Sequence, residues 1–162
     1  MTSKAVIVGS PFSGKSTLCQ LLCRQHPELD VREHDEEVKA LNGGKWPADG
    51  TTAAEIWQQV VEAVKQKQPD IFLTAAIESH QLQIIKQLGY TIIQLIVDEP
   101  TLAARVLERK RDTPANNARY ELKDNLTYQS AIRDQGLVDY QIETHAHDAE
   151  ATYRKVVELL HV

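Results

Sequence analysis

Short apolar runs alternate along the chain with longer stretches in which apolar residues recur at the helical period. Short runs bounded by glycine, proline and polar residues are typical of strands, and helical periodicity is typical of amphipathic helices. The pattern predicts strands at 4–8, 29–32, 71–75, 90–97 and 138–143. It predicts helices at 17–25, 34–41, 52–67, 78–88, 100–112, 118–135 and 148–160.

The succession of strands and helices indicates an α/β fold, with a five-stranded parallel sheet and helices on both faces. Residues 90–97 form the most apolar of the predicted strands, so we expect both faces of this strand to be buried. At 162 residues the chain is expected to form a single domain, 1–162, that buries a sizeable core. Sheets of this kind bind ligands outside the carboxyl ends of their strands, so functional residues are expected in the segments that follow the strands.

The segment Gly9–Ser16 matches the pattern G-x-x-x-x-G-K-[ST] at every fixed position and lies between a predicted strand and a predicted helix. In that context the pattern indicates a phosphate-binding P-loop, although a glycine- and serine-rich turn is the alternative. The backbone N–H groups of such a loop and of the following helix converge on phosphate. Lys15 would reach the outer phosphates, and the Ser16 hydroxyl would ligate Mg²⁺, a cation that prefers oxygen. The expected nucleotide-binding residues of this segment are Gly9, Ser13, Gly14, Lys15, Ser16 and Thr17.

Asp35 follows the strand predicted at 29–32, so it is expected at the same edge of the sheet as the P-loop. A carboxylate there would accept the proton of an acceptor hydroxyl or orient Mg²⁺ through water. The alternative is that Asp35, Glu36 and Glu37 form only the acidic start of a solvated helix, which the helix dipole favours.

Three arginines, Arg105, Arg109 and Arg111, lie on the helix predicted at 100–112. Guanidinium groups suit bidentate contacts with phosphate, so all three are expected to contribute to nucleotide binding. Arg109 is the residue expected to close over the transferred group, and residues 109–119 are the expected lid. The alternative is a basic outer face that pairs with acidic residues of the same helix.

The charge and hydropathy of the chain narrow the range of partners. The formal net charge is −5, so no overall basic field would attract nucleic acid. No apolar run approaches the length of a membrane span, and no signal peptide is evident, so a cytoplasmic location is expected. The expected partners are therefore a nucleotide and a small-molecule acceptor, and the oligomeric state is left open.

The chain resembles the small P-loop kinases, which include shikimate kinase, gluconate kinase, and the adenylate and nucleoside-monophosphate kinases. The resemblance rests on Gly9–Ser16 and on Ile92–Arg109, where a strand leads into an arginine-bearing helix that enters the lid. The segments Tyr128–Arg133 and Val138–Thr144 are similar to the last third of shikimate and gluconate kinases. The resemblance implies a P-loop NTPase fold, the use of ATP and Mg²⁺, and an acceptor-binding segment at about 35–62.

Two segments depart from the shikimate kinase pattern. Glu33-His34-Asp35 stands where those kinases carry Asp-x-Asp, and 74–77 stands where they carry a glycine triplet. Both segments hold the acceptor in that family, so the departures argue against shikimate as the acceptor and leave its identity open. The resemblance also implies that adenine lies near the residues after the last strand, which include His145 and His147; a pair of surface histidines is the alternative.

Together these features predict an ATP-dependent phosphotransferase that acts on a hydroxyl or phosphate acceptor, with Lys15, Asp35 and Arg109 as its catalytic residues and Ser16 and Asp35 as its metal site. A nucleoside or nucleotide kinase is an alternative within the same class. A module that binds nucleotide or hydrolyses it slowly is an alternative from a different class. A GTPase is not favoured, because the sequence contains no N-K-x-D motif.

Overall fold

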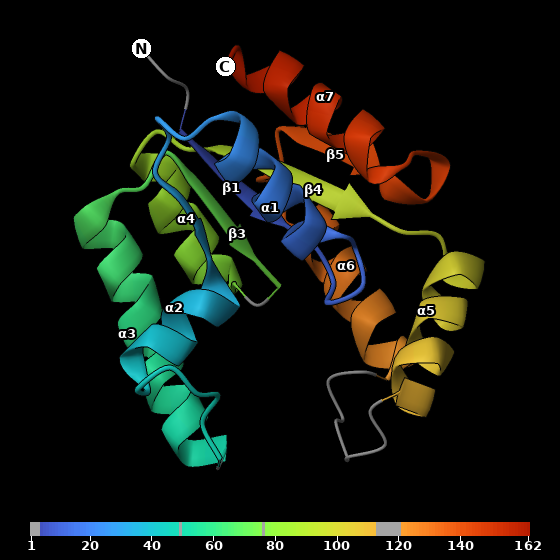
Figure 1. The fold of residues 1–162 in the computed structure, drawn as a ribbon, viewed down its shortest axis with the longest axis horizontal. Helices are drawn as coiled ribbons and strands as arrows, with labels where there is room; N and C mark the ends of the chain where they lie inside the picture. The colour runs from blue at the N-terminus through green and yellow to red at the C-terminus, as the bar shows by residue number, and fades with distance from the viewer. Residues whose placement is uncertain (1–3, 49, 76, 113–120) are drawn as a thin grey trace.

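A computed structural model of the protein describes residues 4–48, 50–75, 77–112 and 121–162, and Figure 1 shows its elements. The strands are β1 (Ala5–Val8), β2 (Val31–Glu33), β3 (Ile71–Thr74), β4 (Thr91–Ile96) and β5 (Tyr140–Glu143). The helices are α1 (Lys15–Gln25), α2 (His34–Leu41), α3 (Gly50–Lys67), α4 (Ser79–Gln87), α5 (Glu99–Asp112), α6 (Leu122–Asp134) and α7 (Ala149–Leu160). A short 3-10 helix, η2 (Thr144–Ala146), connects β5 to α7.

The five strands form one parallel sheet in the order β2-β3-β1-β4-β5. β1 is the central strand, and Ala5 is in register with Ile71 of β3 on one side and with Thr91 of β4 on the other. The chain leaves β1 at the point where the strand order reverses direction, which is where open parallel sheets bind their ligands. The expected fold class is confirmed, and the segment after β1 lies at the predicted binding edge.

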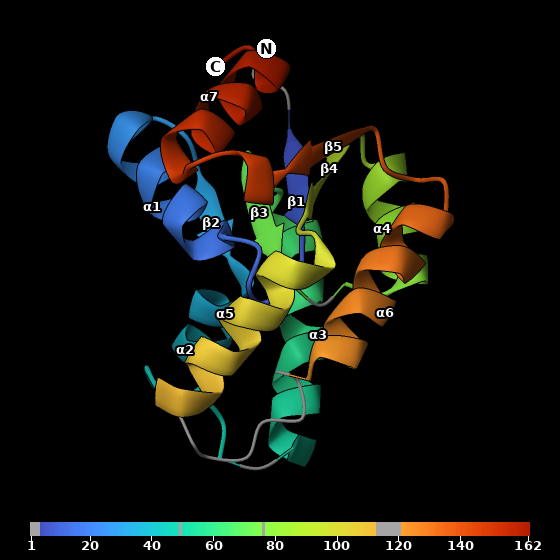
Figure 2. The ribbon, with the colours of Figure 1, turned by 90° about the vertical axis from the view of Figure 1, so that its right-hand side faces the viewer.

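Alternate residues of β1 face opposite sides of the sheet and belong to two separate cores. Val6 and Val8 belong to a core shared with α2, α3, α4 and α6, whereas Ala5 and Ile7 belong to a core shared with α1 and α7. Figure 2 shows α1 and α7 on one side of the sheet and α4 and α6 on the other. Helices therefore cover both faces, and the four internal residues of β4, 92–95, are buried as predicted.

β2 begins and ends later than the sequence predicts, at Val31–Glu33 instead of 29–32. β2 is an edge strand that pairs only with β3, and the pairing begins with Val31 opposite Ile71. The register of this single ladder places Glu33 opposite Leu73, as the last residue of the strand. The shift brings the Glu33 side chain to the carboxyl edge of the sheet, beside the P-loop.

β5 also begins later than predicted, at Tyr140 instead of residue 138. The physical reason is Asp139, whose backbone N–H donates to the carbonyl of Ile92 and whose carboxylate accepts the N–H of the same residue. The side chain thus takes the place of a strand partner, and regular pairing starts one residue later. α6 begins at Leu122, and the earlier residues 118–120 of the predicted helix lie outside the described part of the chain.

A third, smaller core joins the P-loop to the helices beyond β4. Phe12 of the P-loop packs with Val97, Leu102 and Val106, and α6 adds partly buried side chains to the same cluster. This cluster places α5 beside the P-loop (Figure 2). Among the described residues, none of the helices combines the length and the apolar character that a membrane crossing requires.

Candidate active site

The P-loop, Gly9–Ser16, is a closed turn held by its own polar groups. The backbone N–H and the hydroxyl of Ser13 both donate to the carbonyl of Ser10, at 3.1 and 2.8 Å. A Cβ atom on Gly9 would lie 2.4 Å from Ser13 Oγ and 3.2 Å from Leu95 Cβ, so the backbone approach at residue 9 requires glycine. Gly14 adopts φ +86°, a left-handed conformation that places it as the N-cap of α1 and that side-chain-bearing residues rarely adopt.

Lys15 is buried and lies against this loop. Its ammonium Nζ donates to the carbonyl of Ser10 at 2.6 Å and to Ser13 Oγ at 3.4 Å. Burial lowers the pKa of Lys15 from 10.5 to about 8, and the charges of Asp35 and Glu33 act in the opposite direction. Lys15 is therefore a cation with little competing solvation, close to two carboxylates, at the place where an anion would meet the loop.

The Ser16 hydroxyl donates a hydrogen bond of 2.6 Å to Glu33 Oε1. Ser16 lies in the first turn of α1 and Glu33 ends β2, so the contact joins the P-loop to the neighbouring segment at the carboxyl edge of the sheet. A hydroxyl and a carboxylate are hard oxygen ligands of the type that Mg²⁺ prefers. Among the described residues there is no cluster of three or more His, Cys, Asp or Glu side chains that would hold a metal alone. The donor set thus fits Mg²⁺ bound together with phosphate oxygens and water.

Asp35 lies in the first turn of α2, exposed to solvent and near enough to Lys15 to oppose the lowering of its pKa. His34, between Asp35 and Glu33, points the other way: its Nδ1 lies 2.9 Å from Thr74 Oγ1, at the end of β3. Burial lowers the pKa of His34 to about 4, so its imidazole is neutral at physiological pH. The histidine anchors the start of α2 to the sheet and leaves the two carboxylates on the solvent side.

Arg105 and Arg109 both approach the P-loop through Phe12. Arg105 Nη1 donates to the carbonyl of Phe12 at 2.6 Å, and the Arg109 guanidinium lies 6.0 Å from the centroid of the Phe12 ring. Phe12 itself is only 7% exposed. The sequence pattern gave no reason to single out this residue, since it occupies a variable position of the motif.

A cavity of about 500 Å³ lies over the P-loop, between α5 and the start of α7. Residues 11–18 form its floor, and His147 lies on its wall with its Nε2 accepting a hydrogen bond of 2.6 Å from Lys155 Nζ. The other wall residues are Arg105, Glu108, Arg109, Thr144, Ala149 and Thr152. We name this space the P-loop cavity. Two of the three predicted arginines, Arg105 and Arg109, and one of the two predicted histidines, His147, therefore lie around the same space.

A second cavity, of about 670 Å³, lies on the other side of Pro11, which lines both spaces. It is walled by the loop after β3, the start of α4 and one face of α6, and we name it the α6 cavity. Tyr128 on this face accepts the backbone N–H of Ile77 at 3.2 Å through its hydroxyl oxygen. The complete lining is Pro11, Ala75, Ile77, Glu78, Ser79, His80, Asp124, Asn125, Tyr128, Ala131, Ile132 and Gln135.

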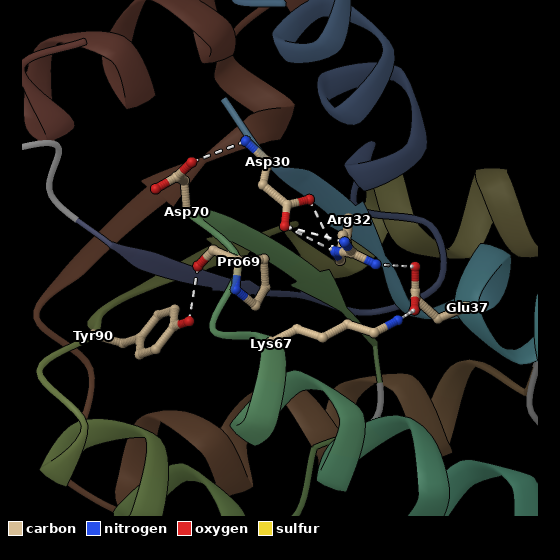
Figure 3. A network of polar contacts seen from close by, with 7 residues as sticks. All are labelled: Asp30, Arg32, Glu37, Lys67, Pro69, Asp70 and Tyr90. Carbon is tan, nitrogen blue, oxygen red and sulfur yellow. Dashed lines mark hydrogen bonds and ion pairs between the residues drawn. The ribbon is translucent and has the colours of Figure 1, made fainter. Parts of the chain in front are cut away.

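A polar network behind β2 holds the carboxylate-bearing segment in place (Figure 3). Arg32 of β2 donates to Asp30 at 2.9 Å and, through Nη1, to Glu37 of α2 at 3.2 Å. Glu37 also lies 3.7 Å from Lys67 at the end of α3, and the Asp70 carboxylate accepts the N–H of Asp30. The network holds α2 against both β2 and α3. It thereby helps to position Glu33 and Asp35, although neither residue takes part in it.

The structure brings most of the predicted site residues together. Ser13 to Thr17 and the two arginines Arg105 and Arg109 line the P-loop cavity, and Gly9 supports its floor. Asp35 does not line either cavity, although it lies within electrostatic reach of Lys15. The side chain of Arg111 and the lid residues 113–120 lie outside the described part of the chain.

Sequence reasoning assigned no individual role to Glu33 or His34, and it considered the helix at 128–133 only through its resemblance to similar kinases. Glu33 could have been found from its position at the carboxyl end of a strand. No local signal identifies the α6 face, because its partners in the cavity come from a segment that lies far away in the sequence.

No protein-family model matches the sequence, and no curated protein matches it either. Comparison with solved structures is decisive for the architecture. The chain has the fold of shikimate kinase. Shikimate kinase from Bacteroides thetaiotaomicron matches with a TM-score of 0.72 at 14% identity, covering 100% of both chains.

Two further solved structures agree with this fold. Shikimate kinase from Acinetobacter baumannii, solved in complex with shikimate, matches with a TM-score of 0.72 at 14% identity over 98% of this chain and 93% of that chain. A gluconokinase from Sinorhizobium meliloti matches with a TM-score of 0.63 at 15% identity over 99% and 92%. The expected P-loop fold is thereby confirmed along the whole chain.

Proposed function

We propose that this protein is a small-molecule kinase that transfers a phosphoryl group from ATP to a hydroxyl group, with Mg²⁺. The observation that carries the proposal is the placement of two cavities on opposite sides of Pro11. Lys15 and Ser16 line one of them, and the other has the size of a small-molecule site. A protein that only binds nucleotide needs one such cavity, whereas a kinase needs a donor site and an acceptor site that meet.

The P-loop cavity is the proposed site of ATP. Backbone N–H groups of the loop and of the first turn of α1 would bind the phosphates, and Lys15 would leave its contact with Ser10 to neutralise them. Arg105 and Arg109 lie on the wall over the loop and would add charge on the side away from Lys15. Ser16 and Glu33 would hold Mg²⁺, which when bound screens the charge of the phosphates during transfer.

Asp35 is the proposed base. An acceptor hydroxyl is a weak nucleophile while it keeps its proton, and a carboxylate within reach relieves this restriction. In the transfer step the acceptor oxygen forms a bond to the terminal phosphorus, the bond from phosphorus to the oxygen of ADP breaks, and the hydroxyl proton passes to Asp35. Asp35 is exposed to solvent, and its charge acts on Lys15 at the edge of the P-loop.

The structural neighbours support a kinase, since they are named as shikimate kinase and gluconokinase. Both names specify hydroxyl acceptors of low molecular weight. The departures at 33–35 and 74–77 argue that this chain uses a different acceptor. A nucleotide-binding or slowly hydrolysing module remains the competing function, and it requires no acceptor.

The test is release of ADP from ATP and Mg²⁺ in the presence of a panel of sugars, polyols, amino alcohols, sugar acids and nucleosides. We expect ADP release to increase at least about tenfold with particular acceptors, and the phosphorylated product to appear in equal amount by mass spectrometry. Release of ADP at one low rate, whatever is added, would instead identify the protein as a hydrolysing or sensing module.

A further inference from the structure

The acidic and basic side chains that line the α6 cavity are Glu78, Asp124 and His80. Glu78 and Asp124 come from different elements, the N-cap of α4 and the first turn of α6. No lysine or arginine is found in the described lining of this cavity. The Glu78 carboxylate already has partners within the protein, because it caps α4 and lies 3.3 Å from His80.

Asp124 differs from Glu78 because its carboxylate has no hydrogen-bond or ion-pair partner among the described residues, 4–48, 50–75, 77–112 and 121–162. The two basic residues of α6 are Lys123, next to Asp124, and Arg133, which is paired with Asp134, and neither lines the cavity. Among the described lining residues, Asp124 is therefore a carboxylate without an ion-pair partner.

One buried polar atom of the lining adds an acceptor. The side-chain oxygen of Gln135 is buried and has no hydrogen-bond donor within the described residues. The remaining wall is largely apolar, with Ile77, Ile132 and the ring of Tyr128. A ligand that suits this lining has an apolar ring or chain and carries donors, namely hydroxyl and ammonium groups.

We propose that the acceptor bound in the α6 cavity is an amino alcohol, a hydroxyl compound with a protonated amine, and that sugar acids are rejected. The proposal rests on the proposed kinase function, in which this cavity is the acceptor site. An ammonium group pairs with Asp124, whereas a carboxylate or phosphate meets like charges without a compensating cation. A neutral polyol has intermediate affinity, because it gains hydrogen bonds but no ion pair.

The test uses three matched probes on the full chain. Each is a cyclohexanol that carries a second substituent across the ring: an amine, a hydroxyl or a carboxylate. Binding is followed through the methyl NMR signals of Ala75 and Ala131, which both line the cavity. We expect the amine to bind at least about tenfold more tightly than the carboxylate, with the diol in between.

Two variants test whether Asp124 is the source of the preference for the amine over the carboxylate. Asp124→Asn should reduce the ratio of amine to carboxylate affinity at least about threefold. Asp134→Asn is the matched control, since Asp134 lies on the same helix and does not line the cavity, and it should leave the ratio unchanged. Thermal unfolding of both variants shows whether the first turn of α6 has been disturbed.

The proposal is overturned if the carboxylate probe binds as tightly as the amine, or if none of the three probes shifts the two alanine signals. Failure of the kinase function would appear separately, as acceptor-independent ADP release with ATP and Mg²⁺. The order of probe affinities is measured without ATP, so the two results are distinguishable.

Discussion

The two cavities on either side of Pro11 are built in different ways. The P-loop cavity takes its floor from one continuous segment, residues 11–18, which includes the motif residues Lys15 and Ser16. The α6 cavity takes its walls from the loop after β3, the start of α4 and one face of α6, and its lining includes the acidic side chains Glu78 and Asp124. The first is therefore suited to a group that is the same in every nucleotide, and the second to a ligand that differs from one kinase to another.

This difference between the two cavities suits a fold whose members share a P-loop but act on different substrates. Substitutions in the P-loop disturb a backbone arrangement in which Gly9 and Gly14 have no substitute. Substitutions on the α6 face change charge and shape without altering the strands that support them. The solved structures that share this fold at 14 to 15% identity include kinases named for two different acceptors, which agrees with this division.

The largest effect is expected from Lys15→Ala. The variant loses the only side-chain cation of the P-loop, so ATP affinity should fall at least about tenfold and turnover should be abolished. Isothermal calorimetry measures the affinity, and Lys39→Ala, which removes a surface lysine paired with Glu36, is the control. Unchanged ATP affinity in a folded Lys15→Ala protein would show that the loop does not bind phosphate as proposed.

Asp35→Asn tests whether Asp35 is the base that accepts the proton of the acceptor. We expect acceptor-dependent turnover to fall by about 100-fold or more, whereas ATP affinity stays within a few fold, because the carboxylate acts on the acceptor proton. Glu36→Gln is the matched control, since Glu36 is the next residue and pairs with Lys39 on the surface. Equal turnover in the wild type and Asp35→Asn would assign Asp35 to the solvated start of α2.

Glu33→Gln tests whether Glu33 contributes to the binding of Mg²⁺. The amide still accepts the Ser16 hydroxyl but has lost its charge, so the Mg²⁺ concentration for half-maximal activity should rise about tenfold. Glu62→Gln, on the exposed side of α3, serves for comparison. A Mg²⁺ dependence identical to that of the wild type would remove Glu33 from the metal site.

Tyr128→Phe affects only the acceptor side. It removes the hydroxyl that accepts the N–H of Ile77, at a cost of about 1 kcal/mol to the loop after β3. The KM for the acceptor should increase a few fold, while the Kd for ATP remains that of the wild type. A parallel change in both constants would mean that the two cavities are not separate binding units.

The smallest expected effect is a proton taken up when ATP binds. Free Lys15 has a pKa of about 8, and nearby phosphate charges raise the pKa of an ammonium, so binding draws in protons at pH values between the two. At pH 8 the uptake should be about half a proton, and ATP affinity should decrease as the pH rises further. Calorimetry in buffers of different ionisation enthalpy measures it, and Lys15→Arg, whose side chain stays charged, should abolish it. Equal uptake by the wild type and Lys15→Arg would assign the proton to another group.

The strands and helices could be predicted from the sequence because their periodicities are local. β1 and β4 are continuous apolar runs, and the motif after β1 has fixed spacing, so both were recognised without knowledge of contacts. The boundaries of β2 and β5 were wrong by one or two residues. Those boundaries depend on the pairing of one strand with another and, at Asp139, on a side chain that replaces a strand partner.

The sequence alone determined the P-loop, since such a loop is formed by neighbouring residues whose backbone conformation depends on their own glycines. Only the tertiary structure decided that Glu33 is the carboxylate beside Ser16, that Phe12 receives Arg105 and Arg109, and that α6 faces the loop after β3. Each of these contacts joins segments that lie far apart in the chain, and their meeting is imposed by the order of strands in the sheet. The physical reason is that local sequence specifies backbone conformation, whereas the charge and shape of a cavity arise from side chains that packing brings together.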